Sequence, residues 1–133
     1  MQGYVKKEIE HVGNMDWYYE HNFIDDSLPT LLLVHGFLSS SFSFRKLVPH
    51  LIKEFNVISV DLPPFGQSGK TNRYIYSFRN FANSLVQLLE GKGIKKFSII
   101  AHSMGGQVSL QLMNAYPELV DRAVLLAGSG YEY

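Results

Sequence analysis

The chain of 133 residues contains no cysteine. This absence excludes a disulfide framework, a thiolate metal site and a cysteine nucleophile. An excess of positive or negative charge is missing as well, because 12 lysines and arginines balance 12 aspartates and glutamates. A neutral chain with scattered charges has no electrostatic footprint for nucleic acid or an anionic membrane. We therefore expect neither as a partner.

Long hydrophobic runs are also absent. Aliphatic runs such as Leu31–Val34 are far too short to span a bilayer. The first ten residues, Met1–Glu10, mix charged side chains with single apolar ones and offer no continuous apolar stretch for a signal peptide. These observations predict a soluble, cytoplasmic protein.

Apolar residues are plentiful enough for one core, since 46% of the chain is hydrophobic and 14% aromatic. Two aromatic and β-branched segments, Tyr4–Val12 and Asp16–Asn22, flank Gly13-Asn14 and predict an antiparallel hairpin. Four later runs are short and almost wholly apolar, as in strands buried on both faces. These runs are Thr30–Val34, Asn56–Val60, Phe97–Ala101 and Ala123–Ala127.

Helical periodicity separates these strands. Apolar residues recur at three- and four-residue steps in Phe44–Leu51, where Pro49 marks a helix start or a kink, and in Phe78–Leu89, which Gly91 and Gly93 follow. A third stripe runs through Val108, Leu112 and Ala115 and should stop before Pro117. The alternation predicts an α/β fold with a mainly parallel sheet, helices on both faces and an N-terminal antiparallel hairpin.

In such sheets reactive groups lie at the carboxyl ends of strands. One of these ends, Ala101–Gly106, joins a predicted strand directly to a helix and places Ser103 at the turn. A serine nucleophile on a tight strand-to-helix turn needs small residues two positions before and after it, and Ala101 and Gly105 meet that need. The alternative is that Ser103 only caps the helix. A plain cap does not require small residues on both sides, so we favour the nucleophile.

Three segments of the chain resemble motifs of the α/β-hydrolase fold family and occur in the same order. They are the strand ending in His35-Gly36-Phe37, the loop Asp61–Ser68 and the turn at Ser103. The likeness spans about Thr30 to Ala127 and is nearest to small esterase-like members. It departs at Ala101, where the family most often has glycine. The resemblance implies that the backbone N–H groups of Phe37 and Met104 form the oxyanion hole around Ser103.

The other histidines and Asp61 are expected to have structural rather than catalytic roles. The position of His35 matches a residue that orients the oxyanion loop, and His102 is expected to be a packed neighbour of the nucleophile. Asp61 should accept backbone hydrogen bonds within a turn-rich loop. The remaining histidines, His11, His21 and His50, lack metal-ligand spacing and are expected in surface or loop positions.

Two further patterns compete with these interpretations. Pro64–Thr71 is one residue short of a phosphate-binding loop. It has proline in place of the first glycine, and the next apolar stripe begins only at Phe78, so we reject nucleotide binding. The aromatic residues Phe37, Phe42 and Phe44 line an acyl pocket or pack in the core, and the sequence leaves both options open.

In the family the order along the chain is nucleophile, acid, histidine. No histidine follows Ser103, and the only later acids are Glu118, Asp121 and Glu132. Glu118 and Asp121 precede a strand and thus belong to the wrong sheet edge, whereas Glu132 follows that strand. We therefore interpret residues 1–133 as the N-terminal half of a hydrolase domain, without its cap and C-terminal strands. The last strand would then leave an open edge prone to association.

The resemblance implies a serine hydrolase acting on a small carboxylic ester or thioester, without cofactor or metal. Relatives with similar motifs also cleave carbon–carbon bonds or act as cofactor-free perhydrolases. Relatives that open epoxides or remove halides use aspartate at the turn, which Ser103 argues against. The alternative from another class is a non-catalytic binding protein, or an inactive fragment, with the same fold.

Overall fold

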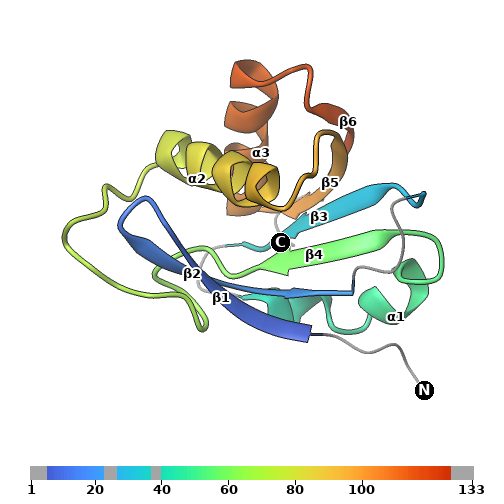
Figure 1. Cartoon of the computed structure of the whole chain (residues 1–133), viewed down its shortest axis with the longest axis horizontal. Helices are drawn as coiled ribbons and strands as arrows, with labels where there is room; N and C mark the ends of the chain where they lie inside the picture. Colours follow the sequence, from blue (N-terminus) through green and yellow to red (C-terminus); the bar gives the residue numbers. More distant parts are fainter. Residues whose placement is uncertain (1–5, 23–26, 37–39, 127–133) are drawn as a thin grey trace, which may run out of the picture.

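A six-stranded mixed sheet organises the chain in a computed structural model that describes residues 6–22, 27–36 and 40–126. The strands lie in the order β1-β2-β4-β3-β5-β6 (Figure 1). Their bounds are β1 Lys6–Val12, β2 Met15–His21, β3 Thr30–Val34, β4 Asn56–Val60, β5 Phe97–His102 and β6 Val120–Leu126. The helices are the 3₁₀ helix η1 Ser41–Phe44, α1 Val48–Leu51, α2 Phe78–Gly91 and α3 Met104–Ala115.

The N-terminal hairpin forms as predicted. Val12 of β1 lies opposite Met15 of β2, which leaves Gly13 and Asn14 as a two-residue loop. Both loop residues have positive φ, 60° and 65°. This geometry suits the right-handed twist of the two strands, and glycine and asparagine are the residues that tolerate it best. β2 then pairs antiparallel with β4 and joins the hairpin to the rest of the sheet.

The four remaining strands run parallel, with β3 between β4 and β5 and with β6 outside β5. The bounds of β3 and β4 agree with the apolar runs that predicted them. β6 begins at Val120, three residues before the predicted Ala123, because Val120 already pairs with Phe97 of β5 ahead of a register irregularity. Ala127, the predicted end of this strand, lies outside the described residues.

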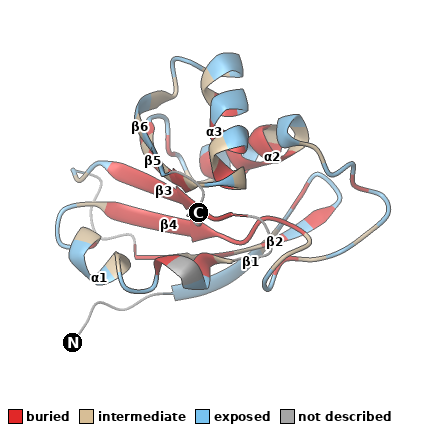
Figure 2. Ribbon diagram, turned by 180° about the vertical axis from the view of Figure 1, so that it is seen from behind, coloured by how far each residue is buried: buried red, intermediate tan, exposed pale blue. Residues whose placement is uncertain are grey.

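Helices cover both faces of the sheet, which confirms the predicted fold class. α2 and α3 lie on one face, and η1 and α1 lie on the other (Figure 1). The larger core fills the α2–α3 side, and a smaller cluster around Leu31, Leu33 and Val57 fills the α1 side. Figure 2 shows that β3 and β4 are buried along their length, as expected for strands packed on both faces.

The segment around Pro49 is not one helix. The predicted apolar stripe Phe44–Leu51 is divided between η1, which ends at Phe44, and α1, which begins at Val48. Pro49 lies in the first turn of α1, where a missing N–H costs no intrahelical hydrogen bond. A helix start near Pro49, one of the two predicted outcomes, is therefore confirmed. Within the described part of the chain, no helix combines the length and apolarity that a membrane crossing requires.

Candidate active site

Ser103 lies at the carboxyl edge of the sheet, between the end of β5 and the start of α3. Its backbone has φ 55° and ψ −116°, in a region that a residue with a side chain rarely adopts. The residue is exposed, and its side chain makes no capping hydrogen bond to the helix. Its own amide donates to the carbonyl oxygen of Leu126 at 3.2 Å. The simple helix-cap interpretation is therefore not supported.

The amide of Met104 is the first N–H of α3. The first amides of a helix have no acceptor within that helix. No other described residue accepts a hydrogen bond from the Met104 amide, whereas the Gly106 amide bonds the Ser103 carbonyl at 2.8 Å. The helix terminus also carries partial positive charge. An unused donor thus adjoins the exposed serine, in a position that suits an anionic oxygen.

Two glycines allow the turn to pack tightly. A Cβ at Gly105 would collide with the carbonyl oxygen of Val34 and lie 2.7 Å from that of His35, both of them rigid backbone atoms. A Cβ at Gly36 would lie 3.1 Å from the Cβ of Ser103. The predicted need for a small residue at position 105 is confirmed. Gly106 is different, because a Cβ there would meet nothing within 4 Å.

His35 is fully buried and fixes the loop that follows β3. The backbone N–H of Leu62 donates to its Nε2 at 2.7 Å, so Nε2 must be unprotonated. Nδ1 then carries the hydrogen and donates to the carbonyl oxygen of Gly36 at 2.6 Å. Burial lowers the pKa of His35, which keeps the ring neutral. The predicted orienting position of His35 is confirmed.

Phe37, the other predicted oxyanion-hole residue, lies outside the described residues. Of the two aromatic residues that follow it, Phe44 is buried in the smaller core. Phe42 is 65% exposed, and the guanidinium of Arg45 lies 4.0 Å above its ring. The core interpretation therefore holds for Phe44 and not for Phe42.

Asp61 is an architectural residue, as predicted. Its two carboxylate oxygens accept backbone hydrogen bonds from Ser41 at 2.6 Å and from Gln67 at 2.7 Å. Its carbonyl oxygen accepts from the Ser68 hydroxyl at 2.6 Å. These bonds tie the loop after β4 to the start of η1. The helix required after a phosphate loop does not follow this segment, because α2 begins only at Phe78.

Two of the three candidate acids after Ser103, Glu118 and Asp121, lie where the sequence predicts them. β6 pairs Val120 with the first residue of β5, and Leu126 with the last. Glu118 and Asp121 are exposed at the amino end of β6, so they are on the sheet edge opposite Ser103. Glu132 lies outside the described residues.

One histidine prediction is wrong. His21 is only 8% exposed, and its Nε2 lies 2.6 Å from a carboxylate oxygen of Glu8. This contact is the main reason why the pKa of Glu8 is lowered. The signal was present in the sequence, because His21 continues the alternate-residue pattern of buried Met15, Trp17 and Tyr19 in β2.

The other two histidines, His11 and His50, are exposed as expected. Across the described ranges, no cluster of three or more histidine or acidic side chains has a geometry able to hold a metal ion.

Comparisons with known proteins agree on one family. The family model described as alpha/beta hydrolase fold matches residues 29–133. Uncharacterized hydrolase YugF of Bacillus subtilis (strain 168) is 46% identical over 120 residues, which cover 90% of this chain and 44% of the relative. A serine hydrolase-like protein of Danio rerio is 34% identical over 102 residues, covering 76% of this chain and 31% of the relative.

A solved structure has a similar fold. Cfl2 of Burkholderia cenocepacia has a TM-score of 0.85 and 28% identity, with 95% of this chain and 46% of that one covered. The chain therefore spans less than half the length of these relatives.

Proposed function

Because the chain belongs to the α/β-hydrolase fold family, we propose that it carries the nucleophile of a serine hydrolase, Ser103. The observation that supports this most directly is the geometry of the turn. An exposed hydroxyl stands on a left-handed backbone position, directly before an amide without an acceptor among the described residues. The serine hydrolase-like relative of Danio rerio supports the same assignment by its name.

The proposed substrate is a small carboxylic ester or thioester. The Ser103 Oγ forms a bond to the acyl carbon while its proton passes to a base, and the carbonyl oxygen becomes anionic between the amides of Met104 and Phe37. The intermediate collapses when the alcohol or thiol leaves with a proton. Water then attacks the acyl-serine and releases the carboxylic acid. Backbone amides suit this role because they are held in place before negative charge develops on the oxygen.

The base and its acid are proposed to come from chain beyond residue 133. Among the described residues, no histidine follows Ser103, and Glu118 and Asp121 lie at the opposite sheet edge. We accordingly regard residues 1–133 as the N-terminal half of one hydrolase domain. A cytoplasmic location stays a prediction.

Association through β6 belongs to the same proposal. β6 is the last strand in the sheet order, and its residues Val124, Leu125 and Leu126 are 42–54% exposed. Adjacent apolar side chains on an outer strand favour pairing with another segment, whether the rest of the domain or a second copy.

The test is labelling of the protein at its natural length with a fluorophosphonate probe. Labelling of the wild type and its loss in Ser103→Ala are expected. Ser98→Ala is the matched control, since Ser98 lies near the other end of β5, away from the turn. Absence of labelling in the folded wild type would contradict the proposal and favour the non-catalytic alternative.

A further inference from the structure

A cavity separate from the Ser103 turn lies on the α1 face of the sheet. It has a volume of about 200 Å³ and is bounded by η1, α1, the end of β2 and β4. Gly36, Ser103 and Met104 are not among its described lining residues. A cavity of about 150 Å³ suffices to bind benzene, so this one accommodates a ring with a short chain.

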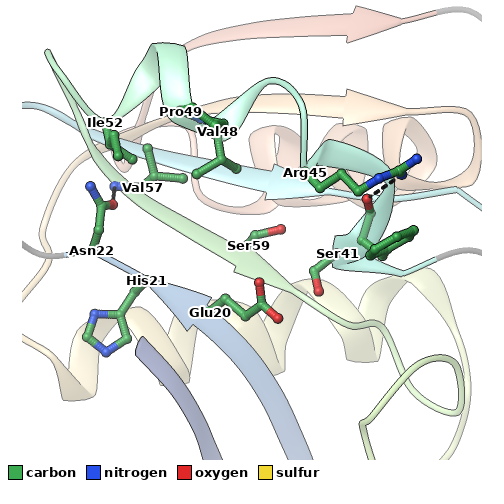
Figure 3. Close-up of a pocket in the computed structure, with 11 residues that line it drawn as sticks. Glu20, His21, Asn22, Ser41, Arg45, Val48, Pro49, Ile52, Val57 and Ser59 are labelled. Atoms are coloured by element: carbon green, nitrogen blue, oxygen red, sulfur yellow. Dashed lines mark hydrogen bonds between the residues drawn. The ribbon is translucent and has the colours of Figure 1, made fainter. Parts of the chain in front are cut away.

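One end of the cavity is apolar. Val48, Pro49 and Ile52 of the α1 segment face Val57 of β4 across it (Figure 3). These side chains provide a surface for a hydrocarbon group but no hydrogen-bonding partner. The apolar end therefore selects for a ligand with a hydrophobic tail.

The other end is polar and is built from two paired strands. Glu20 of β2 lies directly opposite Ser59 of β4, so both side chains project from the same face of the sheet. Figure 3 shows the Glu20 carboxylate and the hydroxyls of Ser59 and Ser41 turned toward a common space. Ser59 is only 3% exposed, and its hydroxyl has no hydrogen-bond partner among the described residues. Buried polar groups normally have one.

The charge at this end is negative and unpaired. Glu20 is half-buried, and one of its carboxylate oxygens accepts a hydrogen bond from the Tyr18 hydroxyl at 2.6 Å. No lysine, arginine or histidine among the described residues forms an ion pair with Glu20. Arg45, which also lines the cavity, donates instead to the carbonyl oxygen of Phe42 at 3.1 Å and stacks on its ring. The second carboxylate oxygen of Glu20 thus has no cationic partner in the described part of the chain.

We propose that this cavity binds a primary amine with a short aryl or alkyl tail. The ammonium group donates to the remaining Glu20 oxygen and to the Ser59 hydroxyl, and the tail lies against Val48, Ile52 and Val57. An ammonium group suits the site because it supplies several donors and a positive charge to a carboxylate and a hydroxyl. This binding site lies beyond the proposed hydrolase activity and does not depend on it.

The experiment titrates the protein at its natural length with 2-phenylethylamine, and with 2-phenylethanol as the neutral analogue of equal size. Calorimetry should show tighter binding of the amine by about tenfold or more, since hydrogen bonds to charged groups are the stronger ones. Glu20→Gln should abolish this preference. Ser59→Ala should weaken amine binding about fivefold.

Ser84→Ala is the matched control. Ser84 is also a buried serine, but it lies on α2 at the other face of the sheet and bonds Tyr74. Amine affinity in this variant should equal that of the wild type. Fluorophosphonate labelling of Ser103 should be unchanged in all of these variants, which separates this proposal from the proposed function.

Equal affinities for amine and alcohol would overturn the proposal. So would the absence of amine binding at about 10 mM, or an amine preference that survives Glu20→Gln. Thermal melts establish that each variant is folded. If Glu20→Gln does not fold, Ser59→Ala against Ser84→Ala decides the question alone.

Discussion

The left-handed backbone of Ser103 makes a quantitative prediction about stability. A residue with a side chain in such a conformation costs about 1–3 kcal/mol. Glycine avoids this cost but loses about 0.5–1 kcal/mol through the greater freedom of the unfolded chain. With φ at 55° and ψ at −116°, Ser103→Gly should therefore raise the free energy of unfolding by about 0.5–2 kcal/mol. Ser103→Ala retains the Cβ and should change it by less than about 0.5 kcal/mol.

Urea denaturation of the natural-length protein measures both changes. Asn14→Gly is the comparison, because Asn14 has φ 65° in the hairpin loop but asparagine tolerates this region. Its gain should stay below that of Ser103→Gly. If Ser103→Gly is no more stable than Ser103→Ala, the turn does not store strain, and the geometric basis of the proposed nucleophile is refuted.

Three further predictions concern the elements around the turn. In urea denaturation, Gly105→Ala should lower the free energy of unfolding by about 3 kcal/mol, because backbone carbonyl oxygens occupy the space of the new Cβ. Gly106→Ala should be neutral or slightly stabilising in the same measurement, because its Cβ would have no contact within 4 Å. Burial lowers the pKa of His35 from its ordinary 6.5, so in mildly acidic solution His35 binds a proton in the unfolded chain but not in the folded chain. Stability should therefore fall as the pH drops below about 6.5 toward the lowered pKa, and His35→Gln should reduce this slope in denaturation curves recorded across that window. Val124→Lys on the outer strand β6 should reduce association of residues 1–133 in size-exclusion chromatography, because a charge opposes edge pairing.

Contrary results would be specific to each prediction. An alanine at position 105 as stable as one at position 106 would contradict the close packing of α3 against β3. If the loss of stability at low pH is the same in His35→Gln as in the wild type, another titratable group causes it. Association unaffected by Val124→Lys would assign it to another surface.

The sequence predicted the parallel part of the fold well because its strands are buried on both faces. Pro29 and His35 flank Thr30–Val34, and Asp61 follows Asn56–Val60, so the ends of these runs coincide with those of β3 and β4. Gly13-Asn14 likewise determined the hairpin, because few other residue pairs accept two positive φ angles. Local chemistry alone was sufficient in these places.

Features that depend on pairing between distant strands were not predictable in this way. The burial of His21 follows from the alternation of β2 alone, but its contact with Glu8 also depends on the register between β1 and β2. The amine cavity depends on Glu20 facing Ser59 across the β2–β4 pairing. No local pattern specifies which strand lies beside β2. Helix division around Pro49 was also left open by periodicity alone.

If Ser103 is the nucleophile, it becomes acylated during the reaction. The most direct test of this assignment is mass spectrometry of the natural-length protein after rapid acid quenching of a reaction with p-nitrophenyl acetate. One acetyl group is expected on the peptide that contains Ser103, and none is expected in Ser103→Ala. An acetyl group on another residue, or catalytic turnover that persists in Ser103→Ala, would contradict it.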